Sequence, residues 1–230
     1  MHTIHNWETW LGTDEAGKGD YFGPVVVAGV HVNAACREAF AELGITDGKT
    51  LSIKRVRQLA EAMRCGYNES IAVVQKMPAA YNALYDDFRR RGKNLNHLLG
   101  ALHAEVIETL HARSGERHVC VDRFANADVI TPQISTAIRR DLRIKQVPKA
   151  ERDIAVAAAS IIARDAFLAG METLSKKYEF QLPRGSYRVT KAGKEFVALH
   201  GASALGEVAK LHFSLTEDVL APAVFRFSAL

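Results

Sequence analysis

The residues of this sequence best suited to chemistry are acidic side chains that follow apolar segments or open them. Asp14 and Glu15 stand side by side in the stretch GTDEAGKGDYFGP, and Asp122 is the last residue of the apolar segment HVCVD. Glu151 and Asp153 open a long apolar stretch, where acids also serve simply to complement a helix dipole. Carboxylate oxygens are the ligands that Mg²⁺ and Mn²⁺ prefer in proteins. Three acids at strand ends and a fourth at a helix start therefore predict a divalent-metal site if they converge.

The adjacency of Asp14 and Glu15 poses a geometric problem, because neighbouring side chains of a regular strand point to opposite faces. We expect the strand to end near this pair. Gly17 and Gly19 would then let the chain turn sharply and bring Glu15 towards the face that Asp14 occupies. Two cations about 4 Å apart at such a site can activate a water and stabilise a leaving oxygen during in-line displacement at phosphorus.

Other kinds of active site fit the sequence less well. The sequence contains neither G-x-S-x-G, typical of a serine nucleophile, nor H-E-x-x-H, typical of zinc proteases. The stretch GTDEAGKG departs from the phosphate-binding pattern G-x-x-x-x-G-K-[ST] only at Gly19. That position lacks the hydroxyl that would hold Mg²⁺, and two carboxylates would repel phosphates. A nucleotide hydrolase of the P-loop type is therefore a disfavoured alternative.

Composition indicates a globular protein with a mildly basic character. The chain has 230 residues, 48% of them hydrophobic and 24% charged, a net charge of +4 and a pI near 9.0. This balance favours a polyanionic partner, and lysines and arginines gather at 49–57, 89–93, 139–149 and 176–194. The N-terminus does not resemble a secretory signal, and the longest apolar stretch is broken by Arg164 and Asp165. Three cysteines without metal-ligand spacing are typical of a reducing cytoplasm.

The pattern of apolar residues predicts an α/β protein with strands and helices in alternation. Because the early strands have short connections and the later ones have helical connections, we expect a mixed central sheet flanked by helices. We expect one domain over 1–230, with a small C-terminal helical lobe from about residue 185. Strands are predicted just before Asp14 and at 25–32, 70–77, 117–122 and 143–150, and helices at 33–45, 52–65, 78–115 (interrupted near Gly92), 131–142 and 151–178.

Several long motifs, taken in order, resemble the type 2 ribonucleases H and among them ribonuclease HIII most. They extend from Gly12 to Phe213 and so span nearly the whole chain. The resemblance implies a ribonuclease H-like fold. The matching stretches are GTDEAGKGDYFGPVVVAG, TDGKTLS, NLNHLLGALHAEVI, VDRF, KAERDIAVAAASIIARDAF, LPRG and KLHF.

The resemblance implies that the catalytic, metal-binding acids are Asp14, Glu15, Asp122 and an acid in the KAE segment, for which we select Glu151. The spacing between KAE and AAAS is one residue shorter than in the family pattern, so Asp153 stays an alternative. The implied cofactors are Mg²⁺ or Mn²⁺, with two ions in the site.

The resemblance also implies a substrate-binding set. Gly17, Lys18 and Gly19 match the segment whose backbone approaches the RNA strand, where amide groups can recognise the 2′-hydroxyl. Lys18 and Lys49 would neutralise phosphates. Tyr187 is similar to the tyrosine that stacks beside the ribonucleotide sugar in ribonuclease HII.

The activity so implied is hydrolysis of the RNA strand of RNA–DNA hybrids, which leaves 5′-phosphate and 3′-hydroxyl ends. Incision at single ribonucleotides in duplex DNA is an alternative, and a catalytically dead hybrid-binding protein is a more distant one. Ribonuclease HIII usually has an N-terminal substrate-binding domain, and eleven residues precede Gly12 here, so we expect that domain to be absent. We expect a cytoplasmic enzyme whose partner is the hybrid duplex, with neither a membrane nor an obligate protein partner.

Overall fold

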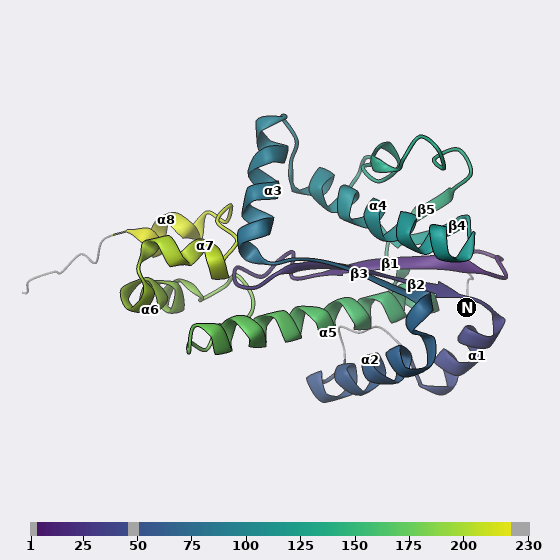
Figure 1. Ribbon diagram of the computed structural model, residues 1–230, viewed down its shortest axis with the longest axis horizontal. Coiled ribbons are helices and arrows are strands. Elements are labelled where there is room, and N and C mark those ends of the chain that lie inside the picture. Colours follow the sequence, from purple (N-terminus) through teal and green to yellow (C-terminus); the bar gives the residue numbers. More distant parts are fainter. Residues whose placement is uncertain (1–3, 46–50, 222–230) are drawn as a thin grey trace, which may run out of the picture.

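A five-stranded mixed sheet forms the centre of the molecule (Figure 1). The computed structural model describes residues 4–45 and 51–221. The strand order is β3-β2-β1-β4-β5, with β1 antiparallel to β2 and parallel to β4. This arrangement confirms the predicted mixed sheet. The strands are β1 (Trp10–Ala16), β2 (Val25–Val32), β3 (Ile71–Lys76), β4 (His118–Asp122) and β5 (Arg143–Val147).

The two faces of the sheet are covered by different helices, and β1 contributes side chains to both. Trp10 belongs to the apolar cluster that includes α5 (Ile154–Lys177), whereas Leu11 belongs to the cluster that includes α4 (Leu95–Ser114). A Cβ atom at Gly12 would overlap the backbone of Ala155, so the glycine allows α5 to lie directly against β1. This alternation determines which face each functional side chain of β1 occupies.

The remaining helices of the N-terminal two thirds extend these two layers (Figure 1). Helices α1 (Ala34–Glu42) and α2 (Ile53–Tyr67) lie on the α5 side, and α3 (Pro78–Arg90) precedes α4. The hydroxyl of Ser52 caps α2 by accepting a hydrogen bond from the Arg55 amide, as predicted. The predicted break within 78–115 is confirmed, since residues 91–94 separate α3 from α4.

Helix α5 is long and apolar because it is the central helix of the core. By length and composition alone it is capable of crossing a membrane, yet 72% of its most apolar window is buried inside the structure. Helix α5 is therefore apolar because it is buried in the core, which confirms the deep packing predicted for 151–178. It begins three residues later than predicted, at Ile154.

The helix predicted at 131–142 is wrong. The segment forms one 3-10 turn, η3 (Thr131–Gln133), followed by bends and turns. The guanidinium of Arg139 donates hydrogen bonds to the carbonyl oxygens of Pro132 and Ile134. In a helix these two oxygens would accept from backbone amides instead. Side-chain bonds of this kind stabilise a compact loop in place of a helix.

The C-terminal residues form a helical lobe beside the β1–β2 connection and α3 (Figure 1). It contains α6 (Thr190–His200), α7 (Leu205–Val208) and α8 (Leu215–Leu220). An isolated β-bridge joins Ala209 of this lobe to Phe22 of the connection. The lobe is therefore attached at the point where the chain leaves the predicted acidic site.

Candidate active site

Two of the predicted acids lie at neighbouring positions because β1 and β4 are parallel. The register pairs Thr13 with Val121, so Asp14 and Asp122 are the next residues along the two strands. Gly12 and its partner Cys120 face α5, and by alternation Asp14 and Asp122 face the same side. Asp14 is 6% exposed, and one of its oxygens accepts a hydrogen bond from the Glu15 amide at 2.9 Å.

A third predicted acid, Glu151, belongs to the short 3-10 turn η4 (Ala150–Arg152), which links β5 to α5. The Ala150 amide donates to Oδ1 of Asp122 at 3.0 Å, which fixes the turn against the end of β4. Lys149 adopts a left-handed φ of 57°, and this unusual conformation turns the chain from β5 into η4. Oε2 of Glu151 is buried and has no hydrogen-bond partner among the described residues. A buried carboxylate oxygen in that state is suited to a cation.

Asp153, the alternative fourth acid, caps helix α5 and bonds to other side chains. Its Oδ1 caps α5 by accepting from the amides of Ala155 and Val156, at 3.0 and 3.2 Å. The same oxygen accepts from Nε1 of Trp10 at 2.9 Å, and Oδ2 lies 2.9 Å from Nε2 of His5. Because both oxygens already have protein partners, the geometry favours Glu151 over Asp153 as a metal ligand.

Glu15 lies on the opposite face from Asp14, and the expected swing is wrong. The strand does not end near the pair: β1 continues through Ala16, and Glu15 pairs with Val27 of β2. Alternation is therefore maintained, and Oε2 of Glu15 lies 3.4 Å from Nε2 of His103 on α4. Asp14 and Asp122 thus share the α5 side of the sheet, and the turn that carries Glu151 is bonded to Asp122, while Glu15 faces α4.

A tighter group of metal-type side chains lies close by. Among the described residues, His5, Cys120 and Asp153 have ligand atoms within 4.8 Å of one another, which the strand-end acids do not. Burial, and then the charge of Asp153, raises the pKa of the Cys120 thiol to about 12, so this thiol is a poor ligand. The hydrogen bond between His5 and Asp153 instead ties the N-terminal segment to the start of α5.

The glycine-rich connection has two glycines with different surroundings. Gly17 has a φ of 83°, and a Cβ there would overlap the carbonyl oxygen of Pro24, so the turn itself requires glycine. Apart from its two chain neighbours, no atom of the described residues lies within 4 Å of a Cβ built on Gly19, so this part of the connection leaves room for a partner. Between them, Nζ of Lys18 lies 3.7 Å from Oε1 of Glu15 and 5.3 Å from the ring centroid of Phe124.

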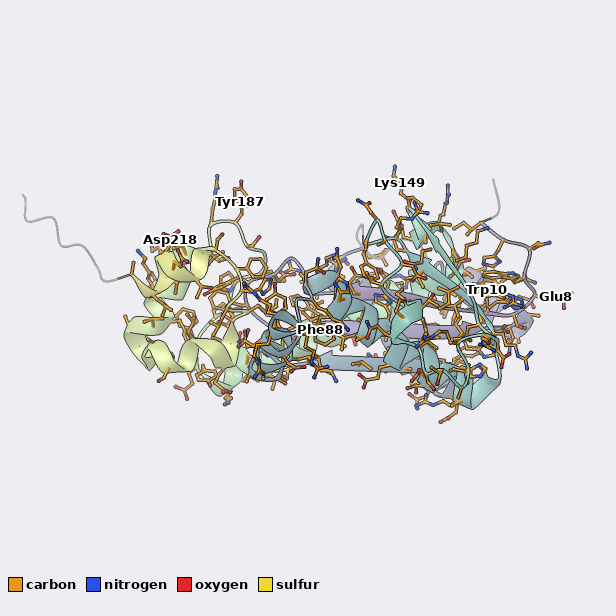
Figure 2. All side chains as sticks on the ribbon, turned by 90° about the horizontal axis from the view of Figure 1, so that it is seen from above. Glu8, Trp10, Phe88, Lys149, Tyr187 and Asp218 are labelled. Atoms are coloured by element: carbon orange, nitrogen blue, oxygen red, sulfur yellow. The ribbon has the colours of Figure 1, made fainter. Side chains whose placement is uncertain are left out.

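Of the other two predicted substrate-binding residues, Tyr187 lies within the described part of the chain, two residues after Gly185, whose carbonyl accepts a hydrogen bond from the Tyr21 amide of this connection. Tyr187 is 91% exposed in the segment before α6, and Lys49 lies outside the described residues. Tyr187 and Lys149 project from the same side of the molecule (Figure 2). Since Lys149 directly precedes η4, that side also carries the turn with Glu151.

Sequence reasoning missed a buried lysine that holds the glycine-rich connection in place. Lys210 is fully buried, and its ammonium group donates to the carbonyl oxygens of Phe22 and Gly23 at 3.3 and 2.6 Å. Burial lowers the pKa of Lys210 to about 7, while the charge of Asp20 opposes that shift. The KLHF motif contains this residue, but a lysine in a motif carries no sign that its target is a backbone loop far away in the sequence.

The phosphate-binding alternative does not fit the fold. A P-loop joins a strand to a helix whose N-terminus holds the phosphates. Residues 17–24 instead join β1 to β2, its antiparallel neighbour.

Comparison with known proteins identifies the family and the fold. The family model for ribonuclease HII matches residues 11–216. A ribonuclease HIII of Protochlamydia amoebophila (strain UWE25) is 44% identical over 213 residues, which are 91% of this chain and 68% of that protein. The crystal structure of Bst-RNase HIII in complex with Mn²⁺ superposes with a TM-score of 0.82 and 33% identity, over 95% of this chain and 71% of that one. Ribonuclease HII of Archaeoglobus fulgidus, solved in complex with PCNA, superposes with a TM-score of 0.70 and 26% identity, over 94% and 98% of the two chains.

The five-stranded mixed sheet with helices on both faces is thus a ribonuclease H-like fold, and the class of protein is a ribonuclease H enzyme. The chain belongs to the ribonuclease HII family. The expected metal dependence and the expected Mg²⁺ or Mn²⁺ cofactor agree with these comparisons. The expectation that no protein partner is obligatory stays a prediction.

Proposed function

We propose that this enzyme hydrolyses the RNA strand of RNA–DNA hybrids with two divalent cations and leaves 5′-phosphate and 3′-hydroxyl ends. The observation that supports the proposal is that Asp14 and Asp122 follow paired positions of β1 and β4, and that the turn that carries Glu151 is hydrogen-bonded to Asp122. The buried Oε2 of Glu151 lacks a hydrogen-bond partner among the described residues, which suits a set of hard oxygen ligands for Mg²⁺ or Mn²⁺.

In this proposal Asp14, Asp122, Glu151 and Glu15 hold the cations. Bound Mg²⁺ or Mn²⁺ would supply an activated water and would neutralise charge that develops on the phosphate during in-line displacement. The chain's own contribution is to hold the carboxylates ready. The Ala150 amide fixes Asp122, and the Glu15 amide orients Asp14, so neither carboxylate has to reorganise on binding.

The glycine-rich connection is the proposed element that recognises RNA. The open surface of Gly19 allows close approach of a ribose, and backbone amides there can meet its 2′-hydroxyl. Lys18 and Lys49 would neutralise phosphates. Tyr187 projects on the same side as the turn that carries Glu151, which suits contact with the same duplex (Figure 2).

The test is cleavage of an end-labelled RNA–DNA hybrid by the full chain, with Mg²⁺ and with Mn²⁺. Asp14→Asn is expected to lower the rate at least 1000-fold, on the order of 4 kcal/mol of transition-state stabilisation. The matched control is Asp218→Asn, because Asp218 is an exposed acid on the C-terminal lobe (Figure 2) and its variant should cleave like the wild type. Full activity of Asp14→Asn, or no wild-type cleavage with either metal, would refute the proposal.

A second experiment distinguishes the two proposed substrates. A duplex with a run of ribonucleotides and a DNA duplex with one embedded ribonucleotide are compared under identical conditions. Preference for the run supports the leading proposal. Preference for the single ribonucleotide, together with its loss in Tyr187→Ala, supports incision of the ribonuclease HII type.

A further inference from the structure

Helix α4 places a fully buried histidine, His103, against Glu15. The side chain is 0% exposed, and its Nδ1 lies 2.8 Å from the hydroxyl of Thr13. Its other nitrogen, Nε2, makes no hydrogen bond of standard geometry to a described residue, although Oε2 of Glu15 is 3.4 Å away. Leaving a buried polar group without a hydrogen bond costs about 1 to 3 kcal/mol.

The geometry of β1 explains why both contacts converge on one ring. Thr13 and Glu15 are two residues apart on the strand, so their side chains point to the same face, which α4 covers. With Nδ1 held by the Thr13 hydroxyl, Nε2 is the nitrogen that points along the strand towards Glu15.

A second contact restricts rotation of the imidazole. The ring of Phe124, just past the end of β4, stacks on His103 with centroids 4.9 Å apart and an interplanar angle of 17°. Lys18 lies over the same phenyl ring and also contacts Oε1 of Glu15 at 3.7 Å. The two oxygens of Glu15 are thus divided: Oε2 faces His103, and Oε1 faces Lys18 and the glycine-rich connection.

We propose that His103 is a positioning residue for Glu15: its Nε2–H, 3.4 Å from Oε2, comes within hydrogen-bonding distance of that oxygen after a small shift of the carboxylate and thereby sets the orientation of Glu15 when a cation is bound. The inference rests on the proposed function, because it assumes that Glu15 is a metal ligand. Groups that hydrogen-bond to metal ligands fix the orientation of those ligands, and their loss commonly weakens metal binding by about 10- to 100-fold. Because His103 is completely buried, it acts through Glu15 and does not contact substrate.

Two amide substitutions separate the two ring nitrogens. The terminal amide of His103→Gln reaches the place of Nε2 and keeps a donor towards Glu15. The shorter amide of His103→Asn replaces Nδ1 and keeps only the contact with Thr13. Both variants lose the ring that stacks on Phe124, so each serves as the other's control for lost packing.

The measurement is Mn²⁺ binding to the full chain by isothermal titration, with the melting temperature of each variant recorded in parallel. His103→Asn is expected to weaken Mn²⁺ binding at least 10-fold, whereas His103→Gln should stay within about 3-fold of the wild type. Equal Mn²⁺ affinity in both variants, whether high or low, would overturn the inference. If neither variant folds, ¹⁵N-resolved NMR of the wild type decides, because a proton on Nε2 is required and its absence would overturn the inference.

Glu15→Gln distinguishes failure of this inference from failure of the proposed site. If Glu15→Gln binds Mn²⁺ as tightly as the wild type, Glu15 is not a ligand, and both the inference and that part of the proposed function fall. If Glu15→Gln loses affinity while His103→Asn keeps it, only the role of His103 is refuted.

Discussion

The contrast between Asp153 and Glu151 gives a sharp test of which acid stabilises the fold and which serves the chemistry. Asp153→Ala removes the cap of α5, worth about 1 kcal/mol, and takes the acceptor from the buried N–H of Trp10, worth about 1 to 3 kcal/mol. The expected loss of stability is about 3 kcal/mol. In a chain of this length each kcal/mol of lost stability lowers the melting temperature by about 2 to 4 °C, so the melting temperature should fall by about 6 to 12 °C.

Glu151→Gln should behave in the opposite way. It replaces a buried oxygen that has no hydrogen-bond partner among the described residues, so the melting temperature should stay the same or rise slightly. Mn²⁺ affinity and hybrid cleavage should fall at least 100-fold, on the order of 3 kcal/mol.

The assay combines thermal unfolding followed by circular dichroism, Mn²⁺ titration, and cleavage measured well below the melting temperature of both variants. Asp153→Ala should then bind Mn²⁺ within a few-fold of the wild type. If Asp153→Ala melts like the wild type and loses Mn²⁺ binding while Glu151→Gln remains active, the assignment of the two acids is reversed.

Three further perturbations test other parts of the structure. Gly12→Ala forces α5 away from β1 and should destabilise the fold by about 3 kcal/mol, measured by urea unfolding, whereas a change under 1 kcal/mol would contradict the close packing. Lys210→Met removes the donor to the carbonyl of Gly23 and should lower hybrid cleavage more than 10-fold while Mn²⁺ affinity changes less than 3-fold; equal loss of both would contradict its role in holding the connection. Burial, followed by the charges of Lys210 and Arg89, lowers the pKa of His212 to about 4. Between pH 6.5 and pH 4 the unfolded state therefore binds a proton that the folded state does not, and the free energy of unfolding should fall by about 2 kcal/mol as the pH falls through this range. His212→Asn should flatten this part of the curve of unfolding free energy against pH.

The elements with a clear local signal were predicted well. The run of β-branched residues gave Val25–Val32 without error, and the Ser52 cap and the break near Gly92 were also confirmed. The helix expected at 131–142 failed because the decisive interaction is a side chain, Arg139, that bonds to the loop's own carbonyl groups.

The geometry of the acidic site was only partly predictable. The apolar segment HVCVD correctly placed the end of β4 at Asp122. The orientation of Glu15 was not predictable, because it depends on how far β2 continues the pairing with β1, which the sequence around Gly17 does not reveal. His103 was equally hidden: a histidine on an apolar helix is buried in many proteins, and only the register of α4 over β1 brings it to Thr13 and Glu15.

The hydrogen bonds between the glycine-rich connection and the C-terminal part of the chain affect when the enzyme can become active during its synthesis. The Tyr21 amide donates to the carbonyl of Gly185, the Gly23 amide donates to that of Val208, and the ammonium group of Lys210 bonds to Phe22 across 188 positions of sequence. A ribosome therefore completes β1, β4 and every proposed metal ligand before Gly185, Val208 and Lys210, the partners of this connection, have been added. Nuclease activity is expected only once the last of these partners has emerged, so a truncated chain would contain the acids of the site without a working enzyme.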